Sequence, residues 1–244
     1  MRTMLLLVVV CLGLGGISAA ALDVTSCGEI VPAGQAARLA ADLDCPSGAG
    51  IVLGDRARLY LDGHVLSGSP DSSNVVCQGP KCKIVGPGEI VGGNYAVTGE
   101  GEVLVSEATI RDQIRGGIDG IASVRVRRVT MTGIGFGHPS PSSSEVIRSG
   151  RLRGPYLEAR NNAGGISSTE YRLRHATITD NGGIGIGGPG FGRLSRSTVT
   201  GNLGGALGVP IDVFGIQPPK LYNTVCDHSY NANNGGDFGI CQLD

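Results

Sequence analysis

The stretches RLRHATITDN (residues 172–181) and RLSRSTVTGN (residues 193–202) begin 21 residues apart and match each other closely. Each places one apolar residue, Ile178 or Val199, between two threonines. Reading outward from this pair, we expect one such anchor residue per repeat, at Val65, Ile90, Ile110, Met131, Leu157, Ile178, Val199 and Val225. The successive steps are 25, 20, 21, 26, 21, 21 and 26 residues. A base period near 21 with occasional longer steps predicts a parallel β-helix of about eight coils, with insertions at its turns.

Within this repeat the residues alternate between inward and outward positions, as they do along a β-strand. The fifth residue before the anchor is apolar in four consecutive coils and is expected to face inward: Val126, Leu152, Leu173 and Leu194. Asparagines follow three of the anchors at corresponding turns, at Asn161, Asn181 and Asn202. We expect them to stack on one another and to satisfy backbone groups at the bend.

The composition agrees with an all-β solenoid. The chain contains 42 glycines, four phenylalanines and no tryptophan. Glycine does not recur at every third position, which excludes a collagen, and the many Val, Ile and Thr residues argue against disorder. The glycines of the segment 182–188 recur from coil to coil, so we interpret them as turn and strand residues and not as a nucleotide-binding loop.

The first 21 residues are typical of a secretory signal peptide. Arg2 carries their only charge, residues 5–17 form an almost unbroken apolar run, and small residues precede the expected cleavage after Ala21. The run is too short to span a bilayer, and no second apolar stretch of spanning length follows. We therefore expect a protein that is secreted, periplasmic or on the cell surface, without a transmembrane segment.

Six cysteines remain after residue 21, and an even number in an exported chain indicates disulfides. The sequence alone allows fifteen pairings. We predict three local ones: Cys27–Cys45, Cys77–Cys82 and Cys226–Cys241. A metal site is the alternative interpretation of the cysteines, but no CxxC pair or histidine spacing supports zinc.

The N-terminal stretch carries a family resemblance. The segments 27–29 (CGE), 41–46 (ADLDCP), 50–53 (GIVL) and 59–68 (LYLDGHVLSG) are similar to the opening coils of secreted right-handed β-helix proteins of the pectate-lyase-like superfamily, and residues 83–209 resemble its generic coils. The resemblance implies a right-handed single-stranded parallel β-helix. We divide the chain into a signal peptide (1–21), N-terminal capping coils (22–82) and β-helix repeats with a disulfide-closed C-terminus (83–244).

The resemblance does not define an activity, because the superfamily includes lyases, hydrolases, epimerases and proteins that are not enzymes. The Asp-Asp pair and Gly-His-Gly segment of polygalacturonase-like members are missing here. Asp112 and Asp180 are expected three coils apart, about 14 Å, which is too far for the carboxyl pair of a glycosidase. Residues 137–140 (GHPS) lack the aspartates of epimerase-like members, and adjacent coils offer no cluster of acidic calcium ligands. We expect no cofactor and no metal.

One feature remains without a structural explanation, a stripe of arginines at outward positions. Counted back from four successive anchors, the sixth and fourth residues form two columns, and seven of these eight positions are arginine: Arg125, Arg151, Arg172 and Arg193 in one column, and Arg127, Arg153 and Arg174, with Ser195, in the other. Residues 111–174 contain eleven arginines and five acids, whereas the chain after residue 21 has a net charge of −2. Like charges across a ladder are unfavourable, so the stripe suggests an anionic ligand, with a merely solvated face as the alternative.

Two function hypotheses follow. The first is a protein that binds an anionic polysaccharide along the stripe, with a polysaccharide lyase as the enzymatic variant; nucleic acid is not expected because these strands carry no aromatic stacking platform. The only acid–base candidates beside the stripe are Arg174, His175 and Glu158, although Glu158 can also simply pair with an arginine. The second hypothesis is a non-catalytic structural or adhesive β-helix. Insertions at 138–145 and 210–217 are expected to wall the two ends of the stripe, with a surface loop as the alternative for the first.

Overall fold

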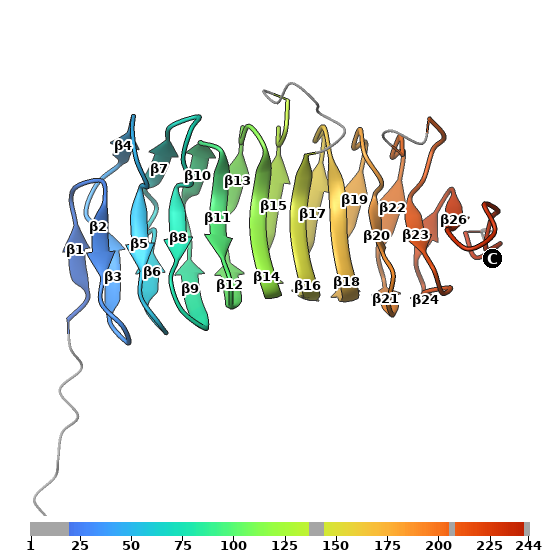
Figure 1. Cartoon of the computed structure of the whole chain (residues 1–244), viewed down its shortest axis with the longest axis horizontal. Coiled ribbons are helices and arrows are strands. Elements are labelled where there is room, and N and C mark those ends of the chain that lie inside the picture. The colour runs from blue at the N-terminus through green and yellow to red at the C-terminus, as the bar shows by residue number, and fades with distance from the viewer. Residues whose placement is uncertain (1–19, 137–143, 205–207, 242–244) are drawn as a thin grey trace, which may run out of the picture.

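The computed structural model describes residues 20–136, 144–204 and 208–241. In these ranges the chain forms only β-strands and turns, and its coils stack in sequence order along one long axis, with β1 and β26 at opposite ends of the solenoid (Figure 1). None of the described segments forms a helix of the length and apolar character that a membrane crossing requires. The residues 1–19 of the predicted signal peptide lie outside the described ranges.

Every strand pairs in parallel with the equivalent strand of the neighbouring coil, and the paired strands form three faces along the solenoid. Face one consists of β2 (Glu29–Val31), β5 (Ile51–Leu53), β8 (Val75–Cys77), β11 (Tyr95–Gly99), β20 (Ile186–Gly188), β23 (Val213–Gly215) and β26 (Ser229–Asn231). Face two consists of β1 (Leu22–Val24), β3 (Ala36–Leu39), β6 (Arg58–Tyr60), β9 (Lys81–Val85), β12 (Glu102–Ser106), β21 (Gly192–Ser195) and β24 (Lys220–Tyr222). Three long strands pass from face one into face two: β14 (Gly116–Arg127), β16 (Glu145–Pro155) and β18 (Gly165–Arg174).

Face three is a separate nine-stranded sheet. It consists of β4 (Leu43–Cys45), β7 (Val65–Gly68), β10 (Glu89–Gly92), β13 (Thr109–Arg111), β15 (Val129–Thr132), β17 (Leu157–Arg160), β19 (Thr177–Thr179), β22 (Thr198–Thr200) and β25 (Val225–Cys226). Each coil contributes one strand to this sheet, and the path from the first of its nine strands to the last makes eight full turns. The predicted parallel solenoid of about eight coils is therefore confirmed. Strand β9 begins before the predicted boundary at residue 83 and ends after it, so pairing is continuous there.

The inward residues build one continuous apolar core. Val126, Leu152, Leu173 and Leu194 are all buried, as their positions in the repeat predict. The anchor column on face three is confirmed at Ile90, Ile110, Met131, Ile178 and Val199, but it was wrong in three coils, where the residue in register is Leu66, Ala159 or Cys226 in place of Val65, Leu157 or Val225.

These three errors have two physical causes. The predicted anchors Val65 and Val225 are each one residue away from the residue in register, and a shift by one residue exchanges the inward and outward sides of a strand. Val225 is in fact exposed. The predicted anchor Leu157 is two residues away from the residue in register, and a shift by two residues leaves the inward side unchanged, since Leu157 and Ala159 both face inward. The larger apolar residue, Leu157, was predicted as the anchor, but the small Ala159 stacks between Met131 and Ile178.

A buried polar ladder runs beside the anchors. The ladder member is Asn162 and not Asn161, which is exposed and has a left-handed φ of 52°. The side-chain amide of Asn162 donates to Asn181 (2.9 Å), and that of Asn181 donates to Asn202 (2.9 Å). Their amides also donate to the carbonyls of Met131, Ala159 and Ile178 respectively, which are residues of the anchor column. The predicted asparagine stack is therefore confirmed, with its first member moved by one residue.

The three predicted cysteine pairs are all present. Their Cα atoms lie 5.6 Å apart for Cys27–Cys45, 5.9 Å for Cys77–Cys82 and 4.9 Å for Cys226–Cys241. The first and last pairs lie near the two ends of the solenoid, where an open stack would otherwise expose its core. Three disulfides indicate that the chain folds in an oxidising compartment.

Candidate functional site: the arginine face

Face two carries a longer row of cations than the repeat predicts. Its central column, in axial register, contains Arg58, Lys83, Leu104, Arg125, Arg153, Arg172, Arg193 and Lys220. Neighbouring positions are about 4.8 Å apart at the backbone. Leu104 is the single uncharged member, so five consecutive coils from Arg125 to Lys220 each present one cation on the same line.

The predicted assignment of arginines to columns was wrong in one coil. Arg153, and not Arg151, pairs with Arg125 on one side and Arg172 on the other. The two-residue slip described for Leu157 moves the whole coil, so Leu152 lies between Val124 and Tyr171 instead of beside Val126 and Leu173. Slips by two keep each side chain on its face, which is why all seven predicted arginines are still exposed.

The second column of face two contains Arg127 and Arg174, with Ser106 before them and Ser195 after. Pro155 pairs with Arg174, so cations occur here only in alternate coils. Together the two columns place Arg125, Arg127, Arg153, Arg172, Arg174 and Arg193 on one exposed surface, which we call the arginine face. Arg151 belongs to its border.

On the other side of the central column, a border column alternates in charge. It contains Lys81, Glu102, Ser123, Arg151 and Glu170. Glu102 contacts Lys81 (3.4 Å) and Arg125 (2.6 Å), and Glu170 contacts Arg151 (3.6 Å). The sequence pattern missed these acids because they lie eight residues before the anchors Ile110 and Ile178, outside the two columns at the sixth and fourth residues.

Most of the arginine face has no internal counterion. Among the described residues, no carboxylate oxygen lies within 4 Å of Arg127, Arg153, Arg172, Arg174 or Arg193. Arg193 lies instead over the ring of Tyr222, 4.7 Å from its centroid. Parallel ladders of like charge are unfavourable for folding. A row of unpaired guanidinium groups is therefore suited to bind an external anion.

Glu102 competes for one of these arginines, and this gives a prediction of opposite sign to the loss of an arginine. We expect Glu102→Gln to raise the affinity for an anionic polymer about two- to fivefold, because Arg125 loses its internal counterion and one repulsive charge leaves the border. The measurement is a titration with polygalacturonate at fixed ionic strength. Glu107→Gln is the control, since Glu107 pairs with Arg128 at the next bend. Equal or weaker binding by the Glu102 variant would contradict the prediction.

The arginine face is hollowed in two places. One hollow is lined by Lys83, Arg125, Arg127 and Arg153 with the backbone around Gly154, and the other by Arg172, Arg174, Arg193, Arg196, Tyr222 and Asn223. Both are shallow and open to solvent. Each hollow is therefore bordered by four basic side chains and is accessible to a polymer that lies along the arginine face.

The bend between faces two and three carries a stacked column. One residue per coil takes a left-handed φ between 47° and 58°: Glu107, Arg128, Tyr156, His175, Arg196 and Asn223. The rings of Tyr156 and His175 are parallel with centroids 4.9 Å apart, and Arg128 lies 6.0 Å from the Tyr156 centroid. Tyr156 thus belongs to this bend, and the outward row of Thr130, Thr177 and Thr198 on face three is continued by Glu158.

The proposed acid–base candidates are not brought together. Glu158 is on face three, where it pairs with Arg160 (2.9 Å) and accepts a hydrogen bond from Thr130 (3.4 Å). Arg174 is on face two, and the ring of His175, at the bend, stacks on Tyr156. Glu158 therefore makes the ion pair with an arginine that was its alternative interpretation, and among the described residues no ion pair or hydrogen bond joins it to Arg174 or His175.

The insertion at 210–217 does not build the predicted wall. Residues 210–217 contain β23, which continues face one between β20 and β26, so this segment is part of a coil and not a border of the arginine face. In the other insertion, residues 138–143 lie outside the described ranges, and Glu145 begins β16 on face one.

A second charged cluster, which the sequence did not indicate, lies on face one. Arg148 donates two hydrogen bonds to Asp119 (3.0 and 2.6 Å) and contacts Glu145 (3.5 Å). Burial of the Glu145 carboxyl raises its pKa, against the opposing effect of Arg148. Asp119 on β14 and Arg148 on β16 are direct partners in the register of these two strands, and Glu145 lies three residues before Arg148 on β16.

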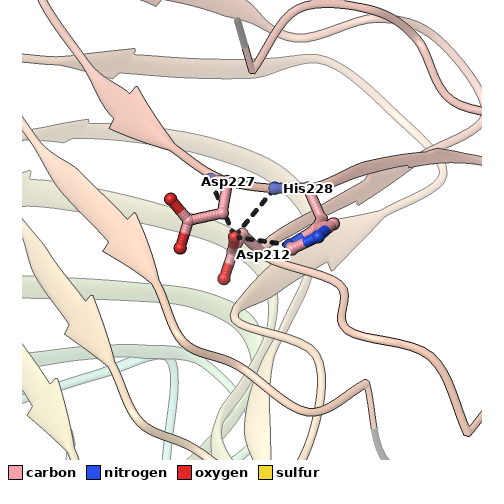
Figure 2. Close-up of side chains that lie close together, drawn as sticks. All are labelled: Asp212, Asp227 and His228. Carbon is pink, nitrogen blue, oxygen red and sulfur yellow. Dashed lines mark hydrogen bonds and ion pairs between the residues drawn. The ribbon is translucent and has the colours of Figure 1, made fainter. Parts of the chain in front are cut away.

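A possible metal-binding group occurs near the C-terminal end. Asp212, Asp227 and His228 offer ligand atoms within 4.8 Å of one another (Figure 2). The fully buried Asp212, however, already accepts hydrogen bonds from the backbone and side chain of Asn202 (3.1 and 2.8 Å) and from the backbone N–H groups of Asp227 and His228 (both 2.9 Å). These contacts make Asp212 the terminal acceptor of the asparagine ladder.

Comparisons with family models, curated proteins and solved structures found no match to this chain. The fold and the arginine face therefore carry the functional argument.

Proposed function

We propose that this protein is an exported, right-handed β-helix of the pectate-lyase-like kind that binds an acidic polysaccharide along the arginine face. The observation that carries the proposal is the two columns of exposed cations on face two, in which five arginines have no carboxylate within 4 Å among the described residues. A guanidinium fork matches a carboxylate or sulfate in two parallel hydrogen bonds. The rigid solenoid holds these forks at regular spacing along a line, which suits a linear polyanion.

Binding without cleavage is the form of this proposal that the geometry favours. The hollows are open, and Glu158 and His175 make contacts of their own away from Arg174. A structural or adhesive role on an anionic matrix uses the same surface. Incubation with polygalacturonate, alginate and heparin, followed by assay of reducing ends and of the ultraviolet absorbance of unsaturated products, separates the two roles: we expect retention of the polymer and no product.

The test of binding is neutralisation of two arginines. We expect Arg153→Gln with Arg174→Gln to weaken binding of an acidic polysaccharide by about tenfold or more and to lower its salt dependence, because fewer counterions are released on binding. Both side chains are exposed and have no carboxylate within 4 Å among the described residues, so the fold should be unchanged. The measurement is affinity as a function of salt concentration by isothermal titration or biolayer interferometry.

A matched control removes the same charge elsewhere. Arg115→Gln with Arg160→Gln changes two exposed arginines outside face two, one in the turn before β14 and one on face three. This double variant should keep most of the affinity. Equal losses in both double variants would indicate attraction by net charge alone, and binding unchanged by the Arg153/Arg174 variant would leave the arginine face as a solvated surface.

A further inference from the structure

The aromatic side chains of the surface gather around the arginine face. Across the described residues, four aromatic residues are exposed: Phe136, Tyr156, Phe191 and Tyr222. Three of them border face two. Tyr156 lies at the bend beside it, Tyr222 ends β24, and Phe191 directly precedes β21. This gathering is not predicted by the repeat, because the three residues occupy different positions in it.

Phe191 lies on the same side of the sheet as the arginines. Its carbonyl accepts a hydrogen bond from the N–H of Tyr171 (3.1 Å), which continues the pairing of β18 with β21 by one position. Gly192 is buried and Arg193 is exposed, so alternation directs Phe191 outward like Arg193, about 7 Å away along the chain. The acid of the neighbouring coil at this position, Glu170, contacts Arg151.

The rings of Tyr156 and Tyr222 both make contacts with other side chains of the protein. Tyr156 stacks on His175 on one side and has Arg128 near the other, and Tyr222 carries Arg193 over its ring. Phe191 has no such ring contact among the described residues, and 69 % of it is exposed. The exposed ring of Phe191 lies beside the arginine face, and packing of the apolar core does not explain this position.

We propose that Phe191, outward-facing and two residues before Arg193, is the ring-stacking contact of the arginine face for an anionic polymer built of sugar rings. The inference rests on the proposed function. The C–H face of a sugar ring is apolar and packs on the negative face of an aromatic ring, while the ring's anionic substituent reaches the adjacent guanidinium groups. Tyr222 is a positioning residue that orients Arg193 by its cation–π contact.

The test separates stacking from charge. Polygalacturonate is the probe with rings, and inorganic polyphosphate is the probe without them. We expect Phe191→Ala to weaken polygalacturonate binding about tenfold, with the salt dependence unchanged, because the lost contact is apolar. Polyphosphate binding should not change. Arg193→Gln should weaken both probes and lower the salt dependence of both.

The chain offers close controls. Phe136→Ala removes a phenylalanine that is 65 % exposed but not on face two, and should have no effect. Phe191→Tyr keeps the ring and should retain binding, whereas Phe191→Leu keeps apolar bulk without the ring and should not. Circular dichroism and thermal unfolding confirm that each variant is folded, as expected for an exposed side chain.

Each contrary outcome is distinct. Polygalacturonate binding unchanged in Phe191→Ala, or lost equally for polyphosphate, would overturn the stacking role while leaving the proposed function intact. A loss seen with single-stranded oligothymidylate but not with polygalacturonate would identify Phe191 as a base-stacking contact and overturn the sugar assignment. Failure of the unchanged protein to bind either polyanion would refute the proposed function and this inference with it.

Discussion

Replacing Asp212 with leucine is expected to lower the free energy of unfolding by about 4 kcal/mol or more, since several buried donors lose their acceptor at once. The carboxylate is fully buried and accepts hydrogen bonds from the side chain of Asn202 and from three backbone N–H groups. It ends the asparagine ladder and ties the penultimate coil to the segment that holds Cys226. The measurement is urea-induced unfolding followed by circular dichroism.

An isosteric pair of variants separates hydrogen bonding from packing. Asp212→Asn keeps the shape but directs an NH2 group at N–H donors, so we expect a loss of about 2 kcal/mol. Asp227→Asn, in the same cluster but with an exposed side chain, should change stability by less than about 0.5 kcal/mol. If Asp212→Asn is as stable as the unchanged protein, Asp212 is not the end of the ladder.

Replacing Gly154 with leucine is expected to destabilise the protein by about 3 kcal/mol or more, although the repeat favours leucine here. The residues in register with Gly154 include Val126, Leu173, Leu194 and Leu221. A consensus argument from the repeat would therefore fill this position with leucine. In the structure Gly154 has a φ of 148°, and a Cβ atom there would overlap the carbonyl oxygen of Val126.

The same substitution tests the register of the arginine face. If Gly154→Leu is stabilising, the coil can take the alternative register in which Leu152 stacks on Val126 and Arg151 joins the central column. Gly236→Ala is a control for glycine replacement in general, because a Cβ there meets only atoms at 3.4 Å or beyond. Thermal unfolding of Gly154→Ala, Gly154→Leu and Gly236→Ala decides between the two registers.

The sequence predicted the register well where neighbouring coils have equal length and poorly where they do not. The repeats around Ile178 and Val199 are 21 residues apart, without insertion, and their pairing is as expected. In the coil that follows the insertion after residue 137, two inward residues compete for the anchor position. The alternation of sides is a property of each strand alone, whereas the choice between Leu157 and Ala159 depends on what the neighbouring coils leave room for.

The candidate site shows the same division. Seven exposed arginines were predicted because outward parity follows from local alternation. The exclusion of Arg151 from the central column, the extension to Lys83 and Lys220 and the aromatic border around Phe191 were not predicted. These features depend on which residues of distant coils become axial neighbours, and no spacing rule within a single coil contains that information.

By itself, then, the sequence determined the all-β solenoid, its coil number, the presence of disulfides and the exposure of the arginines, because each follows from a period, an even count or an alternation that is local to the chain. Which of the fifteen possible cysteine pairings forms was decided by the tertiary structure. Only the tertiary structure decided which side chains stand next to one another along the axis. Axial neighbours are set by the backbone hydrogen bonds between coils, and insertions of different length change that register without changing the side of the sheet that a residue faces.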